Sequence, residues 1–298
     1  MQPGIFKNVS PLGFGIMRLP MNGNTIVESA FKLVEEAVSM GVNYFDMGYT
    51  YQNGYAEEFI GQALVKKYKR SDFYIATKMP LWEVKSEGDL ERIFQDQLTR
   101  LGVDYIDYYL AHLVTKFSWE AMQRFDIKGF FDRKRKEGKI KHIGFSFHST
   151  ADVLEEFLIK YPDMEYVQLQ INYADWEDPE IQSRKCYEMC VKYNKAVIVM
   201  EPVKGGALVD IPKEAVTLLK KEDAGKSIAS WAIRFAASLD NVVIVLSGMG
   251  SEEQMNENTF YMGNFQRLTK KEEKVINKVA EIIRAKEKVD CTVCRYCT

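Results

Sequence analysis

Short apolar segments that suit buried strands alternate with segments of helical periodicity along almost the whole chain, and this alternation constrains the fold most. The strand-like segments are rich in Val, Ile, Tyr and Phe, as expected for strands buried on both faces. Strands that alternate with helices pair in parallel through right-handed crossovers. Eight such strands in 298 residues fit a closed barrel better than an open sheet. The expected strands cover residues 12–16, 43–46, 73–78, 105–111, 140–145, 166–170, 196–200 and 242–246.

The predicted fold is therefore α/β, a (β/α)8 or TIM barrel with a short cysteine-containing C-terminal tail. The barrel is expected to span residues 1–288, and residues 289–298 form a separate segment. Two Thr-x-x-Glu sequences, at 25–28 and 269–272, have the spacing of a capping box and predict that a helix begins at each.

The bulk composition argues against a nucleic-acid or membrane partner. The formal net charge is -2, so no general positive excess attracts polyanions or anionic lipid. The hydrophobic content of 46% and charged content of 28% are typical of soluble globular proteins. No segment approaches the ~18 consecutive apolar residues of a membrane span, and the first residues lack a secretory pattern. We therefore expect a cytoplasmic, reducing location.

Four polar residues lie at or just after the ends of predicted strands. Asp46 ends one strand and Tyr51 follows it by five residues, while Lys78 and His112 end the next two. In a barrel of this type the C-terminal strand ends converge on one rim, and that rim carries the chemistry. A buried lysine needs a nearby anion, so we expect Lys78 to pair with Asp46.

These residue types together form a site that donates a proton to a carbonyl oxygen. An ammonium near a phenol lowers the phenol pKa, so Tyr51 is expected to donate a proton more readily than free tyrosine, whose pKa is ~10. A neutral His112 would hydrogen-bond the same oxygen and orient it, a stabilisation of ~3–4 kcal/mol per donor elsewhere. A barrel isomerase would use the same residues without a nicotinamide, and this alternative stays open.

Several further motifs occur in one order along the chain: FDMGYTY at 45–51, ATK at 76–78, RLGVDYID at 100–107, GFS at 144–146, EPVKGG at 201–206, SGM at 247–249 and EN at 257–258. Together they resemble the aldo-keto reductase family. The resemblance implies an oxidoreductase that uses NADPH or NADH to reduce a small-molecule carbonyl (aldehyde, ketone or sugar-like) to an alcohol, or the reverse. It implies that Tyr51 donates the proton, that Lys78 and Asp46 tune it, and that His112 orients the substrate. The alternative is a nicotinamide-sensing regulatory barrel subunit with little turnover.

The same resemblance implies three groups of cofactor contacts. Glycine is expected where the backbone must approach a phosphate closely, which applies to the group at the pyrophosphate. The carboxamide of the nicotinamide would be held by Ser146 and Gln168, the pyrophosphate would pass Pro202, Val203, Gly205 and Gly206, and the adenosine end would be lined by Ser247, Gly248 and Asn258.

Three positions depart from the family pattern. Phe147 stands where many members have an asparagine, and Met200 stands near the place of a stacking aromatic ring. No Lys or Arg occurs in residues 247–258, where NADPH-preferring members place cations on the 2′-phosphate, and Gly248 and Gln254 occupy the corresponding positions. Since charge-assisted bonds to phosphate are strong, the sequence favours NADH or weak nicotinamide binding.

Three cysteines, Cys291, Cys294 and Cys297, form a C-x2-C-x2-C sequence at the C-terminal end. This is the opening of the bacterial ferredoxin run, and thiolates at this spacing suit an iron–sulfur cluster or zinc. One subgroup of the aldo-keto reductases carries a C-terminal ferredoxin-like 4Fe-4S domain, and we expect this tail to be its truncated start. The full-length protein would then have an electron-transfer partner. Cys186 and Cys190 are expected to be ordinary buried helix residues.

The substrate is not readable from the sequence, and neither is the oligomeric state. Substrate choice depends on the expected rim loops at 79–85, 113–119 and 173–178. Aromatic residues from this rim would wall an apolar or sugar-stacking pocket, or serve only in packing. They are Tyr49, Trp82, Trp119 and Trp176.

Overall fold

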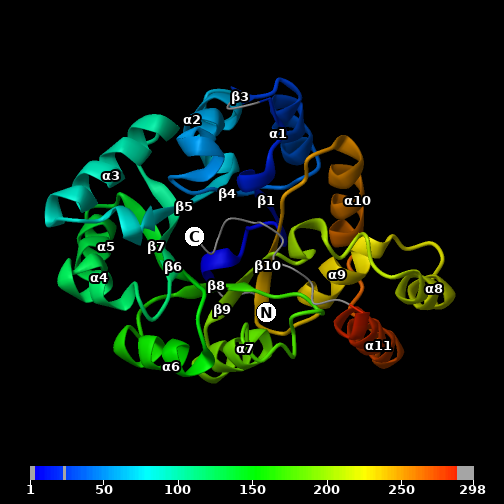
Figure 1. Ribbon diagram of the computed structural model, residues 1–298. Coiled ribbons are helices and arrows are strands. Elements are labelled where there is room, and N and C mark those ends of the chain that lie inside the picture. Colours follow the sequence, from blue (N-terminus) through cyan, green and yellow to red (C-terminus); the bar gives the residue numbers. More distant parts are fainter. Residues whose placement is uncertain (1–3, 23–24, 287–298) are drawn as a thin grey trace.

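The computed structural model describes residues 4–22 and 25–286, and within them eight parallel strands close into a barrel (Figure 1). Each strand pairs with the next barrel strand along the chain, and β1 closes the ring against both β4 and β10. The barrel predicted from the strand–helix alternation is thus confirmed. Its strands are β1 (Leu12–Gly15), β4 (Tyr44–Asp46), β5 (Tyr74–Pro80), β6 (Ile106–Val114), β7 (Ile140–Phe147), β8 (Tyr166–Gln170), β9 (Ala196–Met200) and β10 (Val242–Ser247).

Helices surround the barrel on the outside, as Figure 1 shows. Their apolar faces pack on outward-facing strand residues; the ring of Phe157, for example, lies 4.4 Å from that of Phe145. The described helices are α1 (Ser29–Ser39), α2 (Ala56–Ile60), α3 (Glu87–Leu101), α4 (Trp119–Arg124), α5 (Ile127–Lys136), α6 (Ala151–Lys160), α7 (Ser183–Lys192), α8 (Lys213–Glu222), α9 (Ile228–Ala237), α10 (Glu252–Gly263) and α11 (Lys270–Lys286). None of them is both long and apolar enough to cross a membrane.

The two predicted capping boxes have different outcomes. Thr269 and Glu272 exchange hydrogen bonds at the start of α11, so that box is confirmed. Thr25 instead belongs to a small antiparallel hairpin, formed by β2 (Met21–Asn22) and β3 (Thr25–Ile26), and α1 begins only at Ser29. The first box is therefore wrong, because backbone pairing in the hairpin already engages the residue that was expected to cap the helix.

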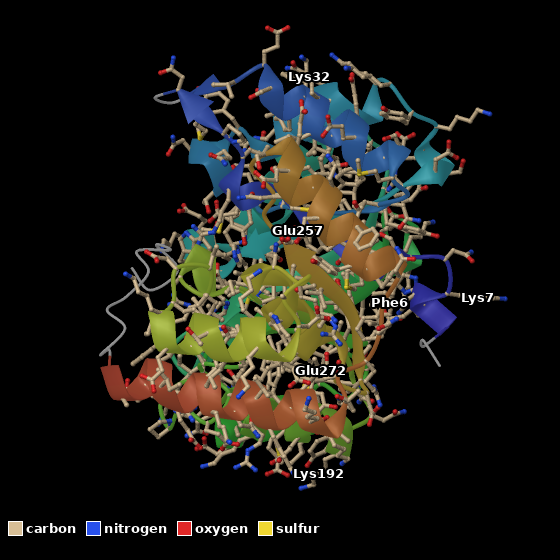
Figure 2. The ribbon with its side chains drawn as sticks, turned by 90° about the vertical axis from the view of Figure 1, so that its right-hand side faces the viewer. Phe6, Lys7, Lys32, Lys192, Glu257 and Glu272 are labelled. Atoms are coloured by element: carbon tan, nitrogen blue, oxygen red, sulfur yellow. The ribbon has the colours of Figure 1, made fainter. Side chains whose placement is uncertain are left out.

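One end of the barrel is closed by an aromatic plug, and Figure 2 labels its member Phe6. A short 3-10 turn, Gly4–Phe6, inserts Phe6, which stacks on Tyr108 at 5.1 Å and meets Tyr166 edge-on at 5.7 Å. All three side chains are at most 1% exposed. Tyr108 and Tyr166 lie toward the N-terminal ends of their strands, so the open end of the barrel is the one formed by the C-terminal strand ends.

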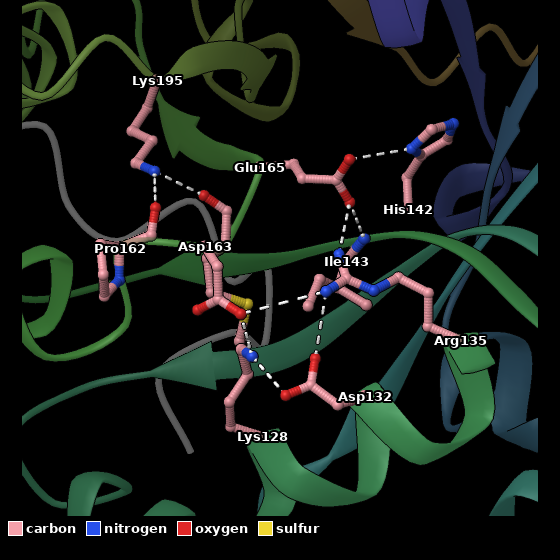
Figure 3. Close-up of polar contacts among 10 residues, drawn as sticks. Lys128, Asp132, Arg135, His142, Ile143, Pro162, Asp163, Glu165 and Lys195 are labelled. Atoms are coloured by element: carbon pink, nitrogen blue, oxygen red, sulfur yellow. Dashed lines mark hydrogen bonds and ion pairs between the residues drawn. The ribbon is translucent and has the colours of Figure 1, made fainter.

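A polar network holds α5, β7 and the start of β8 together on the outside of the barrel (Figure 3). Glu165 accepts a hydrogen bond from the backbone N–H of Ile143 at 2.9 Å and meets Nδ1 of His142 at 3.0 Å. Burial alone would raise the pKa of Glu165, but these two contacts and the nearby Arg135 guanidinium together hold the pKa below its ordinary value. The other charged members are Lys128, Asp132, Arg135, Asp163 and Lys195.

Candidate active site

A buried ion pair lies at the open end of the barrel. Strand alternation points Asp46 on β4 and Lys78 on β5 inward, and Nζ of Lys78 lies 2.7 Å from Oδ1 of Asp46. Nζ also donates to the carbonyl oxygen of Met47. Burial lowers the pKa of Lys78 and raises that of Asp46, and the attraction between the two charges opposes both changes. The pair expected from the sequence is therefore present.

Tyr51 reaches this pair from a tight turn, Tyr51–Gly54, that follows β4. Its ring centre lies 4.9 Å from Nζ of Lys78, and its hydroxyl lies 3.4 Å from Nε2 of His112. Gly48 permits this placement, because a Cβ there would lie 3.0 Å from the tyrosine ring. Gln52, which has a left-handed φ of 53°, anchors the turn by donating to the carbonyl oxygen of Met17 at 2.8 Å.

His112 completes the group from the next strand, β6. It is only 2% exposed, and the ring of Trp82 lies 4.9 Å from its ring. Burial lowers the pKa of His112 well below its ordinary value, and the Lys78 ammonium and His148 lower it further. The imidazole is thus neutral at pH 7. The structure brings together all four residues that the sequence predicted for proton transfer.

A cavity of about 560 Å³ opens beside Asp46 and Tyr51. Of the nine predicted cofactor residues, Ser146 alone is not on its wall. The other eight come from the ends of β8, β9 and β10 and from α10, which is why separate sequence segments converge here. They are Gln168, Pro202, Val203, Gly205, Gly206, Ser247, Gly248 and Asn258.

Ser146 and Gln168 lie side by side on β7 and β8, directly opposite each other in register. The Ser146 hydroxyl accepts the backbone N–H of Leu113 at 2.8 Å, so its own hydrogen remains available for donation. Oε1 of Gln168 is buried and has no hydrogen-bond partner among the described residues. A buried acceptor of this kind at a cavity wall suits an amide donor of a ligand.

The loop after β9 forms a turn of left-handed residues beside the same cavity. Glu201, Lys204, Gly205 and Gly206 all have positive φ, from 49° to 100°. A Cβ at Gly206 would meet nothing within 4 Å, so the backbone is open to a ligand there. Across the cavity, Asn258 of α10 donates to the Ser247 hydroxyl at 3.0 Å.

Arg18 was missed in the sequence analysis. It follows β1, and its guanidinium lies 3.2 Å from Glu201, a residue 183 positions away. It also passes close to both glycine segments: a Cβ at Gly205 would lie 2.8 Å from Nη2, and one at Gly248 would lie 3.2 Å from Cβ of Arg18. Its place just after the first predicted strand was the available signal, since strand ends share one rim.

The part of the cavity that α10 lines is acidic. Glu253 and Glu257 line it, as does Gln254, whose Oε1 accepts the backbone N–H of Gly250 at 2.8 Å. Arg18 is the cation that lines the cavity among the described residues. The shortage of cations seen in the sequence thus holds in space as well.

The predicted metal ligands, Cys291, Cys294 and Cys297, lie outside the described residues. Within 4–22 and 25–286, no group of three or more His, Cys, Asp or Glu side chains is arranged to hold a metal ion. Cys186 and Cys190 are buried on α7 and not joined in a disulfide, as expected. Burial raises the pKa of the Cys186 thiol to about 12, so it is not nucleophilic at neutral pH.

Comparison with known proteins places this geometry in a family. The family model of the aldo/keto reductases matches residues 11–281. An uncharacterized oxidoreductase of Bacillus subtilis, YqkF, is 24% identical over 90% of this chain and 92% of its own. The NADH-specific methylglyoxal reductase of Escherichia coli is 25% identical over 80% of this chain and 83% of its own. The holo form of an aldo-keto reductase from Bacillus halodurans superimposes with a TM-score of 0.74, at 24% identity, over 91% of this chain and 92% of that chain.

Proposed function

The chain belongs to the aldo/keto reductase family of oxidoreductases, and from this premise we propose that its rim reduces the carbonyl of a small molecule with NADH or NADPH, or catalyses the reverse. One observation carries the assignment of the site. The Tyr51 hydroxyl lies 3.4 Å from Nε2 of His112, and the Tyr51 ring centre lies 4.9 Å from Nζ of the buried Lys78. Tyr51 also lines the cavity. A proton donor, a tuning cation and an orienting imidazole therefore face one point.

Each residue of the group has a distinct task in this proposal. Tyr51 gives its proton to the carbonyl oxygen, and the Lys78 ammonium stabilises the negative charge that the phenol acquires. Asp46 keeps Lys78 charged despite its burial. His112, neutral at pH 7, hydrogen-bonds the carbonyl oxygen and orients it. A nicotinamide bound in the cavity supplies the hydride for the carbonyl carbon.

The residues present fit a dinucleotide. The unpaired Oε1 of Gln168 suits the carboxamide N–H₂, and the open backbone at Gly206 suits a phosphate. We assign the carboxamide to Ser146 and Gln168 and the adenosine end to Ser247, Gly248 and Asn258. We assign binding of the pyrophosphate to the backbone of residues 202–206.

We further propose that NADH is preferred to NADPH. The acidic side chains of Glu253 and Glu257 repel an added 2′-phosphate, and Gln254 has no charge with which to bind it. A similar protein from Escherichia coli is named as NADH-specific, which supports the same direction.

A sensing subunit with little turnover is the less favoured function. Sensing requires nicotinamide binding alone, whereas here a buried ion pair is maintained beside a phenol and an imidazole. Burying such a pair carries a desolvation cost that binding alone does not require.

The deciding experiment combines nicotinamide fluorescence with absorbance at about 340 nm, which follows cofactor oxidation on a panel of carbonyls. Tyr51→Phe is expected to lower kcat by ~10²–10⁴-fold while cofactor binding stays within about 2-fold. Tyr55→Phe is the matched control, because Tyr55 is four residues away and 52% exposed. Unchanged turnover in Tyr51→Phe would refute the assignment, and binding without turnover on any carbonyl would favour the sensor.

We also propose that in the full-length protein Cys291, Cys294 and Cys297 provide thiolates to a 4Fe-4S cluster that exchanges electrons with a partner, and that the protein is cytoplasmic. The ferredoxin-like spacing supports the cluster, and the cysteine pattern, which is not that of a secreted disulfide framework, supports a reducing compartment. Iron and acid-labile sulfide should be found after anaerobic reconstitution of the full-length protein and be lowered in its Cys294→Ser variant. Zinc alone, or no metal at all, would reject the cluster.

A further inference from the structure

The turn that carries Tyr51 has an unfavourable backbone conformation. Gln52 and Asn53 have φ of 53° and 57°, in the left-handed region, and Gly54 follows with a φ of 88°. Residues other than glycine keep such a conformation only where their surroundings enforce it. The position of the Tyr51 hydroxyl therefore depends on the contacts that hold the two ends of this turn.

The guanidinium of Arg100, near the C-terminal end of α3, contacts the chain on both sides of the turn. Nη1 donates to the carbonyl oxygens of Tyr49 and Gly54, each at 3.4 Å. The guanidinium also lies over the ring of Tyr49, 4.3 Å from the ring centre. An arginine at a helix C-terminus can serve only to complement the helix dipole. This one instead reaches across to a second segment and spans the turn that carries Tyr51.

Two carboxylates orient the guanidinium. Nη2 of Arg100 lies 2.6 Å from Asp96, one helical turn earlier, and Asp96 also accepts a hydrogen bond from the Tyr49 hydroxyl at 2.8 Å. Nη1 lies 3.7 Å from Oε2 of Glu57, a buried carboxylate oxygen that accepts no hydrogen bond from the described residues. A buried carboxylate oxygen requires compensation, and the guanidinium charge provides it. Arg100 is thereby held toward the two carbonyls of the turn.

Glu57, on α2, continues the same network to the strand that carries Lys78. Its Oε1 accepts hydrogen bonds from Oγ1 of Thr77 at 2.6 Å and from Nε2 of Gln97 at 2.7 Å. Nε2 of Gln97 also donates to the carbonyl oxygen of Lys78 at 3.1 Å. Burial raises the pKa of Glu57, and these hydrogen bonds and the Arg100 charge oppose that rise. Since Thr77 and Lys78 point to opposite faces of β5, the network holds this strand from its outer face.

We propose that Arg100 and Glu57 are positioning residues for proton transfer. Together they join the turn of Tyr51 to the segment of Lys78 on the outer side of the barrel, and so fix the 4.9 Å between the phenol ring centre and Nζ. The inference rests on the proposed function, in which Tyr51 gives its proton to the carbonyl oxygen. Neither Arg100 nor Glu57 lines the cavity, so neither is expected to touch substrate or nicotinamide.

The test is Arg100→Met, which keeps the length of the side chain and removes its N–H groups. A displacement of about 1 Å caused far from the reacting atoms can slow a reaction ~10²-fold, so kcat on the best carbonyl substrate should fall about 10–100-fold. The NADH dissociation constant should stay within about 2-fold, because the cavity wall is unchanged. The variant should also turn over more slowly in D₂O than in H₂O, since transfer of the Tyr51 proton then limits the rate.

Glu57→Gln tests the other member of the pair. The amide keeps the shape of the side chain but removes the charge that orients the guanidinium. Its kcat should fall in the same direction, by at least about 3-fold, with NADH binding again within about 2-fold. A Glu57→Gln variant that folds and keeps the wild-type kcat would remove Glu57 from the proposal.

Arg133→Met on α5 is the matched control, because Arg133 is 61% exposed and lies on the outside of the barrel. It should leave kcat unchanged. A purely structural role of Arg100 predicts a lower urea midpoint with kcat as in the wild type, and that result would overturn the proposal. A slowed Arg100→Met without a solvent isotope effect would place the loss in another step and would also overturn it.

A second variant covers the case in which Arg100→Met does not fold. Arg100→Lys keeps the charge, but its single nitrogen cannot serve both carboxylates and both carbonyls, so kcat should still fall by at least about 3-fold. Failure of this inference is distinguishable from failure of the proposed function. If the wild-type protein reduces a carbonyl and Arg100→Met matches Arg133→Met, the positioning role fails alone. If the wild-type protein reduces no carbonyl, the proposed function fails and the positioning role with it.

Discussion

The ammonium of Lys78 lies 2.7 Å from the carboxylate of Asp46, and the two side chains are 0% and 5% exposed. Such a pair depends on both partners, because removal of one charge leaves the other buried without compensation.

Asp46→Asn is expected to impair both stability and turnover. Burial already lowers the pKa of Lys78, and loss of the Asp46 charge removes what opposes that change. We expect a loss of about 3 kcal/mol in unfolding free energy and a fall in kcat of at least about 10-fold. Urea unfolding and initial rates measure these effects.

Asp107→Asn is the control for Asp46→Asn. It breaks the ion pair with Arg70 on the outer side of the barrel, away from the cavity. It should lower stability but leave kcat unchanged. If the two variants lost the same activity, the Asp46 effect would be a general consequence of instability.

Substitutions of Arg18 and of Glu201 should change dinucleotide affinity in opposite directions. Their ion pair lies beside the glycines assigned to the phosphates, so bound phosphate competes with Glu201 for the guanidinium. We expect Arg18→Ala to weaken NADH binding about 5-fold and Glu201→Gln to tighten it, both less strongly at high salt. Fluorescence titration at two ionic strengths measures this. Arg92→Ala, an exposed change on α3, is the control; a tighter complex with Arg18→Ala would contradict the interpretation.

Gln254→Arg should shift the cofactor preference toward NADPH. The new guanidinium would supply a charge-assisted bond to the 2′-phosphate in an acidic part of the cavity. We expect the ratio of the NADPH and NADH dissociation constants to fall by about 10-fold. Gln95→Arg on α3 adds the same charge away from the cavity and should leave the ratio as it is. An equal gain for both cofactors would mean that the introduced guanidinium acts on the pyrophosphate instead.

Gly61→Ala should destabilise the barrel although its φ is ordinary. A Cβ there would lie 2.6 Å from the carbonyl oxygen of Arg100 and 2.9 Å from that of Leu101. Both are backbone atoms, so relieving the clash would require a displacement of the main chain. We expect a loss of about 2–3 kcal/mol in urea unfolding. Gly88→Ala, whose nearest neighbour would be 3.8 Å away, should instead be neutral or stabilising by up to about 1 kcal/mol. Similar changes in unfolding free energy for the two variants would show that helix propensity, and not steric contact, determines the effect of Gly61→Ala.

Stability should fall with acid through the histidines of the site. The folded-state pKa of His148 is about 4, below the ordinary 6.5, so between these values the unfolded chain binds the proton and the folded protein does not. The contribution is complete above about pH 6.5 and is lost as the pH falls toward 4. We expect a loss of about 1–2 kcal/mol between pH 7 and pH 5, after allowance for partial exposure.

Urea unfolding of the wild type and His148→Gln at several pH values tests this. The variant should lose less stability between pH 7 and pH 5, because glutamine does not titrate. Parallel curves would assign the acid sensitivity to other groups.

The sequence predicted the eight strands and the meeting of four polar residues at the rim, because both follow from local pattern and strand ends. Arg18 lies at such an end too, but its partner Glu201 is distant in sequence, and only the closed barrel brings them together. The hairpin at Met21 to Ile26 was missed because two-residue strands carry no readable alternation.

The aromatic plug has a practical consequence for handling the protein. Since Phe6 fills the closed end of the barrel, deletion of the first six residues amounts to a core mutation, not the trimming of a tail. A tag or surface linker placed ahead of Gly4 leaves the protein from the face opposite the site. An immobilised enzyme attached there would present its open rim to the solution.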